Sequence, residues 1–168
     1  PRPDARREVL LALGRFEGRT FVPDSVGHLQ SAYELALEPF ARGHAALNLA
    51  RSLLFLGAAD EAASLAGRAA RELPAELADL AQSLEAIEVF APVFGAEPNA
   101  DRLERLLTYR EIDSSAGVGA KALAAVASWN WAVSAGPADR VCALARTALE
   151  GGELLAAGPI RLVGRGAS

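Results

Sequence analysis

Few residues of this chain have both the type and the spacing that catalysis or metal binding requires. His28 and His44 are far apart, and neither has a His or Glu at the spacing that places zinc ligands on one helix. Cys142 is the only cysteine, so no internal disulfide can form. Its neighbour Val141 puts it on an apolar stripe, where a free cysteine serves as a small buried hydrophobe. These residues predict no metal, no cofactor and no enzymatic activity.

The carboxylates occur in pairs three residues apart. Glu85 with Glu88, and Asp101 with Glu104, share one face of a helix at this spacing. Such pairs far more often form the solvated side of a helix than a general acid and base, which need different environments. Ser114 and Ser115 precede a helical segment and are interpreted as its N-terminal cap. We therefore expect binding rather than catalysis.

The elements that must position any binding residue are α-helices. Apolar residues make up 51% of the chain and aromatic residues only 6%, a balance that favours packed helices over a β-sandwich. After Gly57, a predicted left-handed helix cap, Ala62, Ala66 and Ala69 recur at helical spacing. Small residues on that face predict close helix packing. Pro92 is expected to kink the helix predicted after Pro74, or to end it early.

Apolar stripes also predict which side chains face inward at the two ends of the chain. The first helix carries Val9, Leu10, Leu13 and Phe16 on one face. In the helix predicted after Ser115, Trp129 belongs to the apolar stripe and is predicted to lie in the core. Trp131 lies off the stripe and is predicted to be exposed, a hint of an interface.

The helices are expected to form a repeat. Four glycines between paired helices lie about 40 residues apart, which is typical of an α-solenoid with two helices per unit; they are Gly14, Gly57, Gly95 and Gly136. We predict an all-α fold, an α-solenoid of about four antiparallel helix pairs over residues 4–157. Its units are expected at residues 4–37, 39–74, 75–111 and 115–152, and residues 158–168 are expected to form an irregular tail.

The unit from His44 to Pro74 resembles a tetratricopeptide repeat. Gly57, Ala62, Ala69 and Pro74 fall at the small-residue and proline positions of that family, although Leu107 and Trp129 depart from the pattern in later units. The resemblance implies a right-handed superhelix whose first helices line a concave groove. The groove positions it implies are His44, Leu47, Arg51, Leu54 and Phe55 in the second unit, and Leu123, Val126, Asn130, Val133 and Ser134 in the fourth.

Four of these positions are the candidate binding residues: His44, Arg51, Phe55 and Asn130. Arg51 and Asn130 are the polar members that would anchor a peptide or effector, and Phe55 would supply an apolar contact. The alternative interpretation is that Arg51 is simply solvated and that Asn130 bonds locally.

Two stretches resemble the helical region of large actinobacterial LuxR-type regulators, namely residues 50–62 and 135–156. The most distinctive part is Gly151-Gly152 followed by Leu154-Leu155-Ala156 and then Gly158-Pro159. These regulators have an N-terminal signal-transduction ATPase domain and a C-terminal helix-turn-helix. The resemblance implies a sensor or relay module whose partners are those neighbouring domains of the same polypeptide, or a protein or peptide. The chain itself contains no Gly-x-x-x-x-Gly-Lys-Ser/Thr phosphate loop.

Charge and hydropathy exclude other classes of function. The net charge is −4 and the arginines are spread out, so direct nucleic-acid binding by this segment is not expected. No apolar run reaches the ~20 residues that span a membrane, and the first residues lack a signal core, which predicts a cytoplasmic protein. The absence of methionine suggests a piece of a larger polypeptide. The alternative function is a free-standing adaptor that binds a peptide or forms a homodimer scaffold.

Overall fold

The computed structural model describes residues 3–19, 24–97, 101, 104 and 117–154. Within these ranges the chain is helical and contains no strand, so the predicted all-α class is confirmed there. The α-helices are α1 (Pro3–Arg19), α2 (Asp24–Leu35), α3 (Pro39–Phe55), α4 (Ala59–Glu72), α5 (Ala78–Phe90), α7 (Val118–Val133) and α8 (Ala138–Leu149). Short 3₁₀-helices are η1 (Ala75–Leu77), η2 (Ala91–Phe94) and η4 (Glu150–Gly152). In the second half of the unit expected at residues 75–111, only Asp101 and Glu104 are described after residue 97, and both are helical. The tail expected at residues 158–168 lies outside the described residues.

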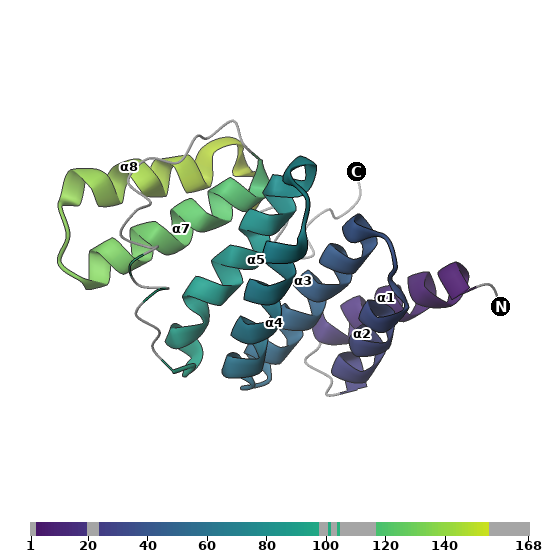
Figure 1. Cartoon of the computed structure of the whole chain (residues 1–168). Helices are drawn as coiled ribbons and strands as arrows, with labels where there is room; N and C mark the ends of the chain where they lie inside the picture. The colour runs from purple at the N-terminus through teal and green to yellow at the C-terminus, as the bar shows by residue number, and fades with distance from the viewer. Residues whose placement is uncertain (1–2, 20–23, 98–100, 102–103, 105–116, 155–168) are drawn as a thin grey trace, which may run out of the picture.

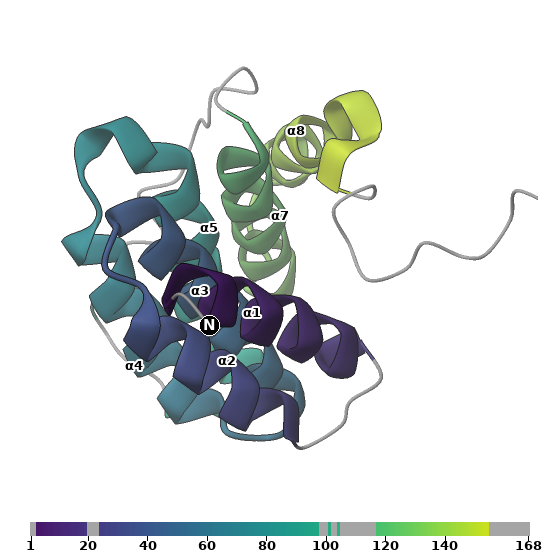
Figure 2. The ribbon, with the colours of Figure 1, turned by 90° about the vertical axis from the view of Figure 1, so that its right-hand side faces the viewer.

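The helices pack in neighbouring pairs along the chain. Helix α1 packs on α2, α3 on α4, and α7 on α8, while α2 with α3 and α4 with α5 join successive pairs. Helix α5 also contacts both α3 and α7. The α1–α2 pair lies at one end of the molecule and the α7–α8 pair at the other (Figure 1), and Figure 2 views the molecule from the α1 end. None of the described helices is both long and apolar enough to cross a membrane.

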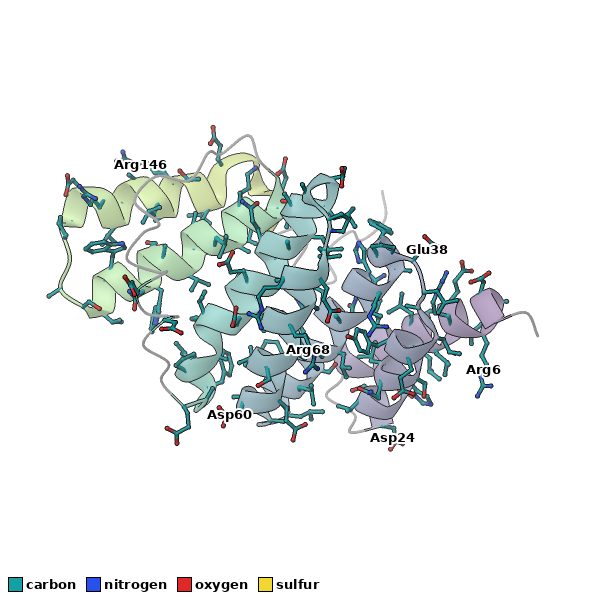
Figure 3. The ribbon with its side chains drawn as sticks, viewed as in Figure 1. Arg6, Asp24, Glu38, Asp60, Arg68 and Arg146 are labelled. Carbon is teal, nitrogen blue, oxygen red and sulfur yellow. The ribbon has the colours of Figure 1, made fainter. Side chains whose placement is uncertain are left out.

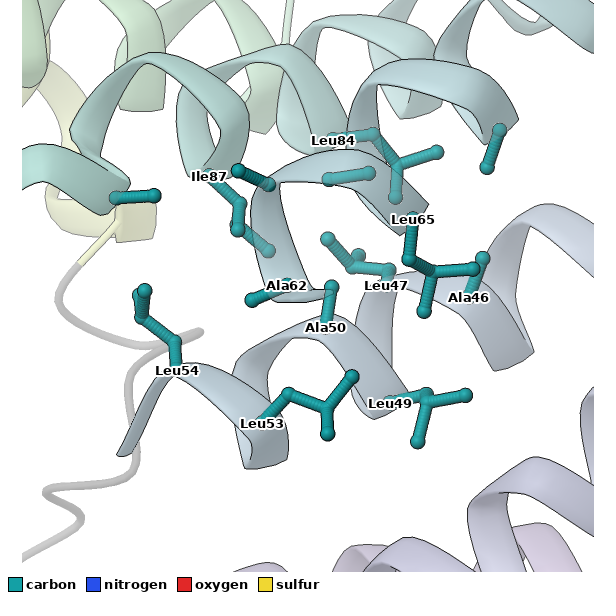
Figure 4. Packing of buried hydrophobic residues seen from close by; sticks show 14 of the residues in the cluster. Ala46, Leu47, Leu49, Ala50, Leu53, Leu54, Ala62, Leu65, Leu84 and Ile87 are labelled. Carbon is teal, nitrogen blue, oxygen red and sulfur yellow. The ribbon is translucent and has the colours of Figure 1, made fainter. Parts of the chain in front are cut away.

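The main core lies between α3, α4 and α5 and is built largely from alanine and leucine (Figure 4). Ala46 and Ala50 of α3 and Ala62 and Ala66 of α4 are fully buried, which lets the two helices approach closely. This confirms the small-residue face predicted for residues 62–69. Leu84 of α5 closes the cluster and is itself fully inaccessible.

Two of the four repeat glycines do not have the role that their spacing suggested. Gly57 and Gly95 take left-handed φ angles of 87° and 95° and end α3 and η2, as expected for turn glycines. Gly14, by contrast, lies inside α1, where a Cβ would press on the Leu29 side chain. In the turn after α7 the positive φ belongs to Ala135, at 53°, and Gly136 lies against Trp131. The common spacing therefore mixes turn glycines with close-packing glycines.

The expected effect of Pro92 on the helix that precedes it is confirmed. Helix α5 ends at Phe90, and the chain continues as the 3₁₀-helix η2 with Pro92 in its first turn. Proline lacks the N–H that would continue the α-helical hydrogen-bond ladder, so the tighter helix replaces it. The result places Phe94 beside the end of α3.

Helix α7 begins with a cap different from the predicted one. Ser114 and Ser115 lie outside the described residues, and the N-cap is Gly117, with a φ of 100° and no side-chain cap of its own. Asp79 of α5 replaces it, because its Oδ1 accepts a hydrogen bond of 2.7 Å from the Gly119 N–H. A Cβ on Gly119 would overlap the Asp79 carbonyl oxygen. Two glycines thus let α7 start directly against α5.

Several predicted inward positions are exposed. On α1, Val9 is 65% exposed and Phe16 69%, because α1 is an end helix and buries Gly14 against α2 instead. The two tryptophans exchange roles: Trp129 is 50% exposed, whereas Trp131 packs against the α7–α8 core. Cys142 is exposed as well, so its predicted burial is wrong.

Candidate functional site

One face of α3 carries polar and aromatic side chains instead of core residues. Phe40, His44, Asn48, Arg51 and Phe55 follow one another at spacings of three or four residues, which aligns them along a single helix face. We call this set the α3 stripe. Phe40 is 58% exposed and Phe55 51%, Arg51 is exposed, and His44 and Asn48 are half-buried.

The rest of α3 faces the core and holds the stripe in place. Ala46, Leu49, Ala50 and Leu53 are all buried. Because one helix supplies both sets, the packing of the apolar face fixes the direction of the stripe. Leu47 and Leu54, which the repeat pattern placed in a groove, are only 7% and 5% exposed and belong to this core.

The two ends of the stripe coincide with the two ends of the helix. Pro39 occupies the first turn, where a missing N–H costs nothing, so Phe40 stands at the N-terminal end. Helix α3 stops at Phe55, and the left-handed Gly57 turns the chain into α4. Both aromatic rings therefore lie next to turns rather than against a continuing helix.

Arginine from a second helix adds charge to the stripe. Arg15 of α1 and Arg51 of α3 both act on His44, whose pKa is lowered first by burial and then by these two positive charges. Although its side chain reaches the surface, Arg51 is partly desolvated by the protein atoms around it, and this desolvation and the charge of Arg15 lower its pKa. Arg51 stays protonated because guanidinium titrates far above neutral pH. The site therefore holds two cations and an imidazole that is neutral at pH 7.

A glycine lets α1 come close to α3 at this point. A Cβ on Gly18 would stand 2.8 Å from the Ser52 hydroxyl oxygen, the residue next to Arg51. The same end of α1 carries the exposed Phe16 beside Arg15. This close approach of α1 to α3 places Arg15, which is distant from α3 in the sequence, beside the α3 stripe.

Aromatic contacts order both ends of the stripe. The Phe40 and His44 rings meet edge to face with centroids 4.7 Å apart. At the other end the Phe55 and Phe94 centroids are 5.6 Å apart, and Phe94 also meets Phe90 at 5.5 Å. These contacts restrict the exposed rings without covering them, which suits them to receive an apolar side chain. Asn48 is fixed too, because its amide donates a 2.7 Å hydrogen bond to the His44 carbonyl.

The predicted fourth member, Asn130, lies elsewhere. It belongs to α7, and α5 lies between α7 and α3 (Figure 1). Its Nδ2 is buried and has no hydrogen-bond partner among the described residues, and the same holds for the indole nitrogen of the adjacent Trp131. The structure thus groups His44, Arg51 and Phe55 on one helix face and separates Asn130 from them.

Phe40, Asn48, Arg15 and Phe94 are the members that sequence reasoning missed. The positions of Phe40 and Asn48 could have been found, since they continue the helical spacing of the three predicted residues. Arg15 and Phe94 carry no such signal, because only the packing of α1 and η2 against α3 brings them there.

A second polar feature lies between α4 and α5. A pocket of about 320 Å³ is bordered by Gly67, Arg71 and Glu88, among other residues. Glu88 is only 6% exposed, and its Oε1 is 3.7 Å from the Arg71 guanidinium. A Cβ on Gly67 would overlap the Glu88 carboxylate, so this glycine makes room for a charge between the two helices.

In the described part of the chain no group of three His, Cys, Asp or Glu side chains could hold a metal ion. The α3 stripe offers guanidinium donors, an amide and aromatic rings, which are groups that recognise a ligand. Comparison with protein-family models, with curated proteins and with solved structures finds no match to this chain.

Proposed function

We propose that this chain is a non-catalytic interaction module that binds a polypeptide segment along the α3 stripe. The observation that supports it is the division of α3 into a buried alanine–leucine face and an exposed face of aromatic, amide and guanidinium groups. Aromatic residues and arginine are the types enriched where proteins bind one another.

The finer architecture that we propose is a tetratricopeptide-like α-solenoid of about four helix pairs in a right-handed superhelix. Its support is the packing of each helix on the next and the additional contacts of α5 with α3 and α7. In such an array α3 would be a first helix of its pair, and the stripe would face the concave side.

The finer biological role that we propose is a sensor or relay module of a cytoplasmic LuxR-type, ATP-dependent transcriptional regulator. It rests on the resemblance of residues 50–62 and 135–156. In that role the occupant of the stripe belongs to the neighbouring ATPase or helix-turn-helix domain. The alternative is a free-standing adaptor, whose occupant is a separate protein or a second copy of the chain.

Site-specific photo-crosslinking in cells that naturally produce the protein tests the proposal and distinguishes the relay module from the free-standing adaptor. Benzoylphenylalanine in place of Phe55 is expected to crosslink one polypeptide segment, identified by mass spectrometry. The same group in place of Arg68 is the control, because Arg68 is an exposed residue of α4 (Figure 3). A crosslink within the same polypeptide supports the relay role, and one to a separate protein supports the adaptor. Absence of a crosslink specific to position 55 contradicts the proposed function.

A further inference from the structure

The two arginines at the α3 stripe give it a positive charge that the described chain does not neutralise. Neither Arg15 nor Arg51 forms an ion pair within the described residues. Other arginines do have acidic partners: Arg7 lies 3.3 Å from Asp4, and Arg71 approaches Glu88. Two guanidinium groups that repel each other and lack a carboxylate gain most from an anionic ligand.

The charge of the whole chain narrows the kind of anion. The protein carries a net charge of −4, so its general field repels a long polyanion such as nucleic acid. At the stripe, by contrast, the charges of Arg15 and Arg51 act together and attract a negative group. A short acidic segment, flanked by groups that suit aromatic surfaces, fits this pattern better than a phosphate backbone does.

The length of the stripe sets the length of the segment. Phe40 and Phe55 stand at its two ends, and a helix rises 1.5 Å per residue, so they are separated by roughly 22 Å along the axis. An extended chain advances about 3.3 Å per residue and covers that distance in about eight residues. Arg51 lies one helical turn from Phe55, which places the negative charge near one end of the segment.

We infer that the α3 stripe binds an extended acidic segment of about eight residues, with apolar side chains on Phe40 and on the Phe55–Phe94 pair and carboxylates on Arg15 and Arg51. This inference rests on the proposed function and names the chemistry of its partner. Asn48 contributes an amide oxygen in the middle of the stripe, because its nitrogen is held by the His44 carbonyl.

A defined probe tests the inference by fluorescence anisotropy. The probe is the labelled peptide Leu-Ser-Ser-Ser-Asp-Glu-Ser-Phe with blocked ends, used together with its reversed sequence. Matched peptides replace Asp-Glu by Asn-Gln or by Lys-Lys, or replace Leu and Phe by Ser, and an eight-nucleotide oligothymidylate serves as the non-peptide anion. Binding is expected for one or both acidic peptides that keep the apolar ends, and it should weaken as salt rises.

Variants of the protein assign the binding to the stripe. Arg15→Gln and Arg51→Gln are each expected to lower the affinity for the acidic peptide about tenfold, which is the loss typical of one charge-assisted contact. Arg68→Gln is the matched control and should change affinity less than about twofold. Phe55→Ala should also weaken binding, whereas Trp129→Ala removes an equally exposed aromatic from α7 and should not. Circular dichroism melts confirm that every variant is folded.

The combined charge reversal Arg15→Glu with Arg51→Glu gives the most direct result. It is expected to abolish binding of the acidic peptide and to create binding of the Lys-Lys peptide. Three results would each overturn the inference. The wild-type protein could bind the Asn-Gln peptide as tightly as the acidic peptide, it could bind the oligothymidylate more tightly than the acidic peptide, or it could bind no acidic peptide at all. A position-55 crosslink to a non-acidic segment would overturn it while leaving the proposed function intact.

Discussion

At the scale of single residues, the α3 stripe combines groups of different charge in a small area. Arg15 and Arg51 are cations at every physiological pH, whereas burial and these two charges hold the pKa of His44 below its usual value of 6.5. A histidine kept neutral in the folded protein but free to take a proton in the unfolded chain links folding to pH.

Acidification is therefore expected to destabilise the fold through His44. As pH falls from 6.5 toward the lower folded value, the unfolded chain binds more protons than the folded one, so the free energy of unfolding decreases. Urea unfolding at pH 7.5 and pH 5.5 should show a smaller loss for His44→Gln than for the wild type. The contribution of the carboxylates to the pH dependence is the same in both proteins, so it cancels when the two losses are subtracted. Parallel pH dependences of the two proteins would rule out this role for His44.

A second residue-scale prediction concerns the pair Lys121 and Glu153, whose Nζ and Oε2 are 2.6 Å apart. The Lys121 side chain is 6% exposed and that of Glu153 is 53% exposed. Glu153→Ala leaves a buried cation alone and is expected to cost about 2 kcal/mol or more of unfolding free energy. Lys121→Met leaves only an exposed carboxylate and should cost less than about 1 kcal/mol. Chemical denaturation measures the loss of unfolding free energy in both variants. Equal losses would contradict the prediction that the buried lysine suffers more from losing its partner than the exposed glutamate does.

At the scale of elements, sequence predicted the parts that local chemistry determines. The left-handed Gly57, the alanine face of α4 and the end of α5 before Pro92 all follow from local steric rules and spacing. The start of α7 does not, because its cap is Asp79 of another helix. Trp129 and Trp131 were assigned inversely for a similar reason: both lie on a mostly apolar helix, and only the position of α8 decides which face is covered.

Loss of the Asp79 cap is expected to destabilise α7. Asp79→Ala removes the acceptor of the Gly119 N–H and should lower the free energy of unfolding by about 1 kcal/mol, up to about 2. Asp79→Asn keeps an acceptor oxygen and should lose less. Thermal and urea unfolding provide the comparison. If Asp79→Ala and Asp79→Asn lower the free energy of unfolding equally, the hydrogen bond is not what anchors α7.

At the scale of the whole molecule, the buried apolar side chains of the described residues are unevenly distributed. Among these residues the main cluster joins α2, α3, α4 and α5, whereas the buried apolar contact between α5 and α7 is a small cluster of Ala86, Val89 and Leu123. Proteins open locally where the fewest buried apolar contacts hold a segment in place. Sequence periodicity located the helices but not this junction, since it depends on how many large side chains meet between α5 and α7.

Hydrogen exchange should therefore show α7 and α8 opening before α3 and α4. Mass spectrometry at increasing urea is expected to give a lower opening free energy for peptides of α7 and α8. Leu123→Ala removes the largest buried side chain of the junction and should lower that value further, while changing α3 and α4 little. Equal opening free energies in all helices would show a single cooperative unit instead.

The separation of the two faces of α3 has a consequence for how this protein can change. Under the proposed function, substitutions at Phe40, Arg51 or Phe55 would alter what the surface binds, while Leu49 and Ala50 on the opposite face keep the helix in place. Exposed positions away from the core usually tolerate substitution within about 0.5 kcal/mol. Binding specificity could therefore change, or be redesigned in a library randomised at these three exposed positions, without a matching change in stability.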